Sequence, residues 1–250
     1  MMKKLYEKNE LTFAIVLIVI YVVGSSLLQK VSAAIGIRFA AETAFNLILS
    51  VIIIVFARKN NLMKHIGLCK PEVSASKMLF YIPLVLIACS AAFFGIGTEF
   101  STIELVFRTT MMIFVGFLEE VIFRGFLFRG IAKDNIKEAI IISSVTFGIG
   151  HIVNLFNGYD ILKNILQIAF AVAIGFLLVF IFLRTGSLIA CIVFHILNNS
   201  ISAVSTGSIL TNALGSEEAA QILFTVFGII ISVAYILFII RSIPKREISD

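Results

Sequence analysis

The sequence of 250 residues has little charge, no tryptophan, three prolines and three cysteines. Charged residues make up 14% of the chain, against about 25% in typical soluble domains. Hydrophobic residues reach 60%, and the mean hydropathy is +1.07. This composition excludes an ordinary soluble domain. Apolar runs long enough to cross a bilayer predict a polytopic membrane protein instead.

Several familiar hydrolase motifs are also missing. Cys69, Cys89 and Cys191 are odd in number and scattered, so they indicate neither a disulfide framework nor a zinc cluster. The chain contains no His-Glu-x-x-His motif and no Gly-x-Ser-x-Gly elbow. These absences argue against a preformed zinc helix and against a serine nucleophile of that type.

The apolar segments predict an all-α fold, with one transmembrane domain over residues 1–250 and about eight transmembrane helices. The first apolar run continues to Leu28, so we expect an uncleaved helix there rather than a signal peptide. The predicted helices cover residues 11–28, 39–57, 78–97, 104–128, 138–156, 163–183, 187–204 and 220–240.

The basic residues predict the orientation of these helices. If the N-terminus is cytoplasmic, the segments on its side hold 15 of the 20 Lys and Arg residues, the opposite side holds 4, and Arg124 lies within the membrane. This skew favours cytoplasmic placement of both termini. The net charge of +5 is then a topology signal and does not indicate nucleic-acid binding.

One stretch places three charges inside an apolar run, at Glu119, Glu120 and Arg124. A charged side chain at mid-depth in a bilayer costs ~2.5–3.5 kcal/mol on insertion scales. On a helix, an acid four residues before a base is in the favourable order for an ion pair. Glu119 is rotated by ~100° from Glu120. We therefore expect Glu120 and Arg124 to neutralise each other and Glu119 to remain unpaired for chemistry.

Three further polar residues lie in predicted spans. His151 ends the segment Phe147-Gly148-Ile149-Gly150-His151, and His195 and Asn199 are four residues apart on one helix face. Each alone is typical of helix packing or of an interhelical hydrogen bond. Together with Glu119 they could activate a water molecule and stabilise an oxyanion. Glu119, His151 and His195 could also serve as ligands of a metal ion.

These motifs, taken in order, resemble those of the CAAX protease and bacteriocin-processing family, also called the Abi or CPBP family. Its pattern appears here as Glu119-Glu120-x-x-x-Arg124, Phe147-x-x-x-His151 and His195-x-x-x-Asn199. The resemblance covers about residues 104–204. It implies an eight-helix fold and glutamate-dependent peptide hydrolysis within a membrane, with a bacterial cell membrane the expected location.

The resemblance also implies a role for each residue. Glu119 would activate water with help from His151, while His195 and Asn199 would stabilise the oxyanion. Glu120 and Arg124 would hold the shape of the site or meet the substrate. The expected partners are membrane lipid and a peptide or lipidated protein substrate. Zinc is a possible cofactor, although the motifs do not spell a standard metal site.

Two other functions fit parts of the pattern. A non-catalytic immunity factor or scaffold could keep the same motifs for packing. A transporter could use buried charges as an ion pathway. Transporters usually show repeat symmetry, which the sequence lacks, and the complete set of motif residues favours a protease over a scaffold.

Overall fold

The computed structural model describes residues 2–97, 99–156, 158–205 and 208–245. In these residues the only β pairing is an isolated bridge between Ile96 and Ser205, so the predicted all-α fold is confirmed. The helices are α1 (Met2–Lys8), α2 (Glu10–Ile35), α3 (Ala40–Lys59), α4 (Ile82–Ser90), α5 (Thr102–Glu120), α6 (Arg129–Ala132), α7 (Ile136–Ile149), α8 (Val153–Phe156), α9 (Ile161–Thr185), α10 (Ile189–Ala203), α11 (Ser208–Leu214) and α12 (Glu217–Ser242).

Local capping residues set the ends of the long helices. Asn9 caps α2 by accepting a hydrogen bond from the Thr12 amide, and Gly36 ends that helix in the left-handed conformation. Ser101 and Glu104 form a capping box at the start of α5. The turns between helices are therefore encoded by short polar motifs, as in soluble proteins.

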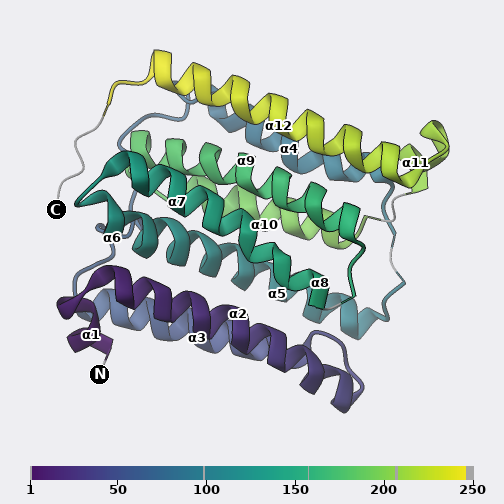
Figure 1. Cartoon of the computed structure of the whole chain (residues 1–250), viewed down its shortest axis with the longest axis horizontal. Coiled ribbons are helices and arrows are strands. Elements are labelled where there is room, and N and C mark those ends of the chain that lie inside the picture. The colour runs from purple at the N-terminus through teal and green to yellow at the C-terminus, as the bar shows by residue number, and fades with distance from the viewer. Residues whose placement is uncertain (1, 98, 157, 206–207, 246–250) are drawn as a thin grey trace.

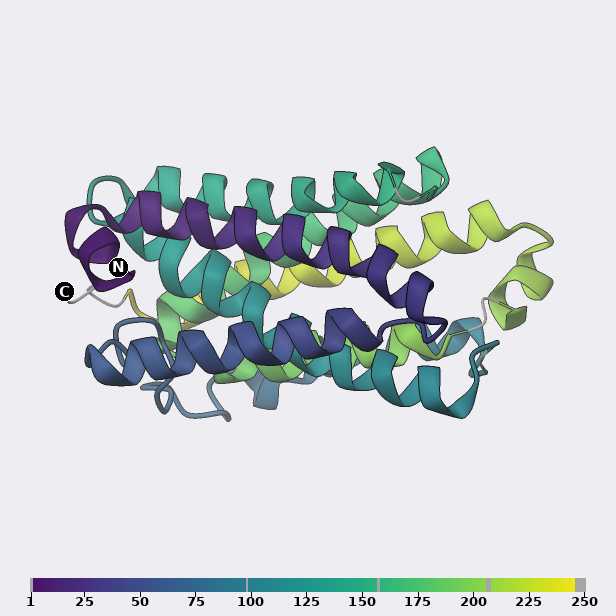
Figure 2. The same ribbon diagram turned by 90° about the horizontal axis from the view of Figure 1, so that it is seen from below.

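The helices form three groups (Figure 1). α2 packs along α3 on one side, α4 and α12 lie on the other, and α5, α7, α9 and α10 fill the space between them. α3 packs against α5, and α2 packs against the segment that follows α5. Figure 2 shows α2 and α3 running beside the central helices along the whole bundle. α2 and α3 thus form one wall against the charged stretch.

Within the described residues, five helical segments are long and apolar enough to cross a membrane: α2, α3, the run Ile136–Phe156, α9 and α12. Their length and composition indicate an integral membrane protein. The apolar helices Leu79–Ser90 and Ile189–Ala203 are shorter. Eight crossings therefore stay a prediction.

The segment predicted as a helix over 78–97 is shorter and broken. Leu79, Phe80 and Tyr81 all have positive φ angles, between 50° and 58°, so regular α-helix starts only at Ile82. Pro83 lies in the first turn of α4, a position where its missing N–H costs nothing. The turns at either end of α4 are 3₁₀-helical, which leaves the α-helix nine residues long.

The helix predicted over 104–128 is also not uniform. It begins as α5 and changes at Val121 to a π-helix that continues to Phe128, before α6 completes it. A π-helix forms i→i+5 hydrogen bonds and has a wider turn than an α-helix, and such turns are frequent at functional sites. The wide turn begins directly after Glu120 and contains Arg124.

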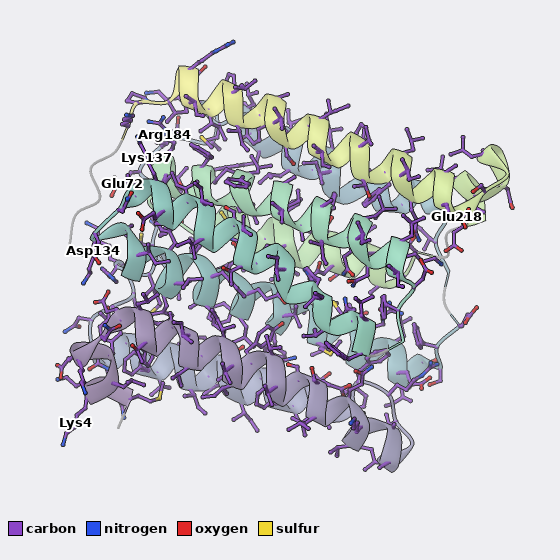
Figure 3. All side chains as sticks on the ribbon, viewed as in Figure 1. Lys4, Glu72, Asp134, Lys137, Arg184 and Glu218 are labelled. Atoms are coloured by element: carbon purple, nitrogen blue, oxygen red, sulfur yellow. The ribbon has the colours of Figure 1, made fainter. Side chains whose placement is uncertain are left out.

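Both ends of the described chain lie at one end of the bundle (Figure 1). Figure 3 shows Lys4, Asp134, Lys137 and Arg184 at that same end, whereas Glu218 lies at the other. Lys4, Lys137 and Arg184, which the sequence analysis places on one side of the membrane, thus lie at one end of the bundle. The cytoplasmic placement of this basic end stays a prediction.

Candidate active site

The predicted ion pair is present at the centre of the bundle. Arg124 Nη1 donates to Glu120 Oε1 at 3.1 Å, and both side chains are completely buried. The guanidinium carbon also lies 4.0 Å from the centre of the Phe147 ring, a distance typical of a cation–π contact. A buried charge is tolerated when it is paired and surrounded in this way.

His195 joins this pair to Glu119. Its Nδ1 lies 2.8 Å from Glu120 Oε1, and its Nε2 lies 3.3 Å from Glu119 Oε2. The imidazole of α10 is thus held between the two adjacent carboxylates of α5. A carboxylate on Nδ1 fixes the orientation of the ring and leaves Nε2 facing the second acid.

A glycine on α5 makes this approach possible. A side chain at Gly116 would meet the backbone nitrogen of Ile196 at 2.9 Å, so only glycine lets α10 come this close. Ile196 follows His195 directly in sequence. The close contact between the two helices therefore delivers His195 to the carboxylates.

Glu119 is not unpaired, which corrects the expectation from the sequence. Its Oε1 accepts a hydrogen bond of 2.7 Å from the hydroxyl of Tyr21, in addition to the contact of Oε2 with His195. Tyr21 lies on α2 and is buried. Both oxygens of the carboxylate are therefore held, and 12% of its side chain stays exposed.

Phe147 and His151 come from α7 and the turn after it. The Phe147 ring lies 5.6 Å from that of His195 and 5.8 Å from that of His151. Asn164 on α9 donates to the His151 carbonyl at 2.9 Å, and Gln167 Nε2 lies 3.5 Å from His151 Nδ1. Phe147 therefore packs between the two histidines and the arginine, a role that its place in the motif did not reveal.

Glu119 and His151 face the same cavity, of about 240 Å³. Its walls come from α2, α3, α5 and the end of α7, and it extends toward the loops that hold Phe39 and Tyr159. Asn199 instead lines a second cavity of about 470 Å³ between α9, α10 and α12. The structure thus brings Glu119, His151 and His195 together with Glu120 and Arg124, and places Asn199 in the adjoining space.

The described residues contain no group of three His, Cys, Asp or Glu side chains placed to hold a metal ion. Glu119, His151 and His195 were the possible ligands in the sequence. In the structure, His195 has its Nδ1 on Glu120, and His151 has its Nδ1 near Gln167. The arrangement does not fit a metal site, and we derive no step through one.

Residues 100–201 match the family described as Type II CAAX prenyl endopeptidase Rce1-like. The match confirms the resemblance carried by the three motifs. It covers less than half of the chain and includes Glu119, Glu120, Arg124, His151, His195 and Asn199. Comparisons with curated proteins and with solved structures found no match. Tyr21 lies outside the matched segment.

The two adjacent acids should differ in their effect on stability. Glu120→Ala leaves Arg124 as a buried unpaired cation, and breaking a buried pair costs ~3–5 kcal/mol. Glu119→Ala removes hydrogen bonds but strands no buried charge, so its cost should be smaller. Thermal unfolding of the purified variants should show the lower melting temperature for Glu120→Ala. Equal melting temperatures would mean that the pair does not stabilise the fold.

Tyr21→Phe should lower activity without loss of the fold. The change removes only the hydroxyl that donates to Glu119, and a hydrogen bond to a charged group contributes ~1.5–3 kcal/mol. We expect kcat to fall by roughly 10- to 100-fold, since each ~1.4 kcal/mol is a factor of ten.

Tyr235→Phe is the matched control for this variant. Its hydroxyl is also buried and donates to the Met78 carbonyl at 2.6 Å, on the opposite side of the bundle. It should lose a similar amount of stability and keep its activity. An unchanged kcat in Tyr21→Phe would show that Tyr21 does not position the carboxylate.

Proposed function

We propose that this protein is an intramembrane endopeptidase that hydrolyses a peptide bond of a membrane-associated or lipidated protein or peptide. The observation that supports this most strongly is the setting of Glu119. It is a carboxylate on the wall of a cavity, held by Tyr21 and His195 and backed by a completely buried ion pair. The Rce1-like match over the same residues points to the same class of reaction.

In the proposed reaction Glu119 acts as the base. It takes a proton from a water molecule while the water oxygen attacks the carbonyl carbon of the substrate, which gives a tetrahedral intermediate. The carbon–nitrogen bond then breaks, and the proton on Glu119 passes to the leaving amine. The products are a carboxylic acid and an amine, and Glu119 returns to its starting state.

The two histidines have different parts in this proposal. His151 lines the cavity together with Glu119, so it can donate to the carbonyl oxygen as negative charge develops there. His195 touches Glu119 directly and holds its carboxylate in place. The family pattern suggests oxyanion stabilisation by His195 and Asn199. We favour His151 because Asn199 lines the second cavity.

Glu119→Gln tests the base directly. The amide keeps the shape of the side chain but cannot accept a proton, and removing a general base costs ~10²–10⁴-fold in rate. Cleavage would be followed with internally quenched farnesylated peptides and by mass spectrometry of new protein termini in cells. Glu218→Gln, at the far end of the bundle, is the control and should behave as wild type. Full activity in Glu119→Gln would rule out this mechanism.

Metal removal should leave the activity intact. Among the residues that the structure describes, no third side chain joins Glu119 and His195 in a metal-binding group, so we expect purified protein to be active after exhaustive chelation and to carry no stoichiometric zinc. Elemental analysis is paired with activity before and after chelation. Zinc at one equivalent, with activity lost on its removal and restored on its return, would contradict the proposed water activation by Glu119 alone.

A further inference from the structure

His151 lies in a turn between two helices, against the start of α9. α7 ends at Ile149, and the 3₁₀ turn Gly150–Ile152 carries His151 before α8 begins. This turn packs against α9. A side chain at Gly148 would meet the backbone nitrogen of Val172 at 2.9 Å, so glycine at this position lets α7 come close to α9. The close approach places the imidazole next to polar side chains of α9.

Three carboxamide side chains form hydrogen bonds at this turn. Asn164 donates to the His151 carbonyl at 2.9 Å and holds the backbone. Asn154 Nδ2 donates to Gln167 Oε1 at 2.9 Å, and Gln167 Nε2 lies 3.5 Å from His151 Nδ1. Asn154 and Gln167 are thus linked in one chain of hydrogen bonds that ends on the imidazole ring.

This chain of hydrogen bonds has a direction. A carboxamide has one oxygen, which accepts, and one NH₂ group, which only donates. Because the oxygen of Gln167 accepts from Asn154, the NH₂ group of Gln167 is the part that faces His151 Nδ1. A ring nitrogen that accepts a hydrogen bond carries no proton. The proton of the neutral imidazole therefore lies on Nε2.

The network lies in the partition between the two cavities. His151 and Asn154 line the cavity of Glu119, whereas Gln167 lines the second cavity. Since Gln167 holds Nδ1, Nε2 is the ring nitrogen left for a substrate. A protonated Nε2 can donate to a carbonyl oxygen as negative charge develops there, whereas an unprotonated Nε2 would present a lone pair and repel that charge. The tautomer thus decides whether His151 can act as the donor.

His195 is held in a different way. Its Nδ1 lies 2.8 Å from Glu120 Oε1, and its Nε2 lies 3.3 Å from Glu119 Oε2. Carboxylates accept hydrogen bonds, so they favour a proton on each nitrogen that they contact. The NH₂ group of Gln167 has the opposite effect on Nδ1 of His151. The two histidines therefore differ in which ring nitrogens carry protons, a difference that the two motifs do not reveal.

We propose that Gln167, itself oriented by Asn154, is a positioning residue that fixes the tautomer of His151 so that Nε2 carries the proton and donates to the oxyanion. This inference rests on the proposed peptidase function. It assigns roles to two amides that lie outside the three motifs. Hydrogen bonds that only join helices would contribute to stability whatever their direction. The direction of this chain is therefore what the test has to change.

The test reads the tautomer by NMR. The chain has three histidines, so protein labelled with ¹⁵N-histidine in nanodiscs gives few signals, and those of His151 are identified by their loss in His151→Gln. Wild-type protein should show an unprotonated Nδ1 and a protonated Nε2. Gln167→Glu replaces the donor by an acceptor and should place a proton on Nδ1.

Asn154→Asp should give the same shift with Gln167 still present. A carboxylate cannot donate to Gln167 Oε1, so the amide of Gln167 should turn its NH₂ group toward the new acid and its oxygen toward His151. This variant separates the direction of the hydrogen bonds from the packing of Gln167. Melting temperatures of all variants are measured alongside to confirm that they fold.

Activity on the internally quenched farnesylated peptides should follow the tautomer. Removing one oxyanion donor lowers kcat by ~10²–10³-fold, so we expect a loss of this order in Gln167→Glu and Asn154→Asp, with KM nearly unchanged. Gln167→Met, which leaves the tautomer free, should lose less. Gln221→Met is the matched control, because Gln221 lines the same second cavity and lies 3.5 Å from Glu217 rather than near His151. It should behave as wild type.

The NMR arm separates this inference from the proposed function, since it needs no cleavage. If the wild type cleaves no peptide but its tautomer shifts in Gln167→Glu and Asn154→Asp, the peptidase function fails and the control of His151 by Gln167 stands. A proton on Nδ1 in the wild type, or a tautomer that stays the same in both variants, overturns the inference. A shifted tautomer with an unchanged kcat also overturns it, because His151 would then not be the donor.

Discussion

The buried pair of Glu120 and Arg124 is the interaction on which the site depends. Either charge alone in this interior would cost several kcal/mol, and the two are tolerated because they lie 3.1 Å apart with Phe147 against the guanidinium. The pair also supplies the oxygen that holds His195 Nδ1. Since His195 in turn contacts Glu119, the ion pair made by the neighbouring residue, Glu120, helps to fix the position of the candidate base.

Backbone geometry then brings the other helices to this pair. The π-helix starts directly after Glu120, and Ser143 on α7 donates to the carbonyl of Phe123 within it at 2.8 Å. On the opposite flank, Gly116 allows α10 to approach α5 until their backbones nearly touch. A wide turn and a missing side chain thus place α7 and α10 around one charged segment. A regular α-helix after Glu120 would lack the wide turn, and a larger residue at position 116 would keep α10 away from α5.

Much of the architecture could be predicted from the sequence, because apolar runs and capping residues are local signals. The long helices, the ion pair at i and i+4, and the three motifs all fall in this class. The hydrogen bond between Tyr21 and Glu119 does not, since it joins residues 98 positions apart and a lone tyrosine in an apolar helix has no pattern. The π-helix has no residue signature, and the break at Leu79–Tyr81 involves three large residues with positive φ.

Two different parts of the chain form the candidate active site. Glu119, Glu120 and Arg124 lie in the segment that matches the Rce1-like family, but one wall of the cavity that Glu119 lines comes from α2 and α3, outside that segment. That wall carries Tyr21, Ser25, Gln29 and Asn46, which offer hydroxyl and amide groups to the cavity. Such groups suit the hydrogen-bonding needs of a peptide backbone in a place where water is scarce. Changes in α2 and α3 could therefore alter which substrate fits while the buried ion pair, and the carboxylate that it positions, remain as they are.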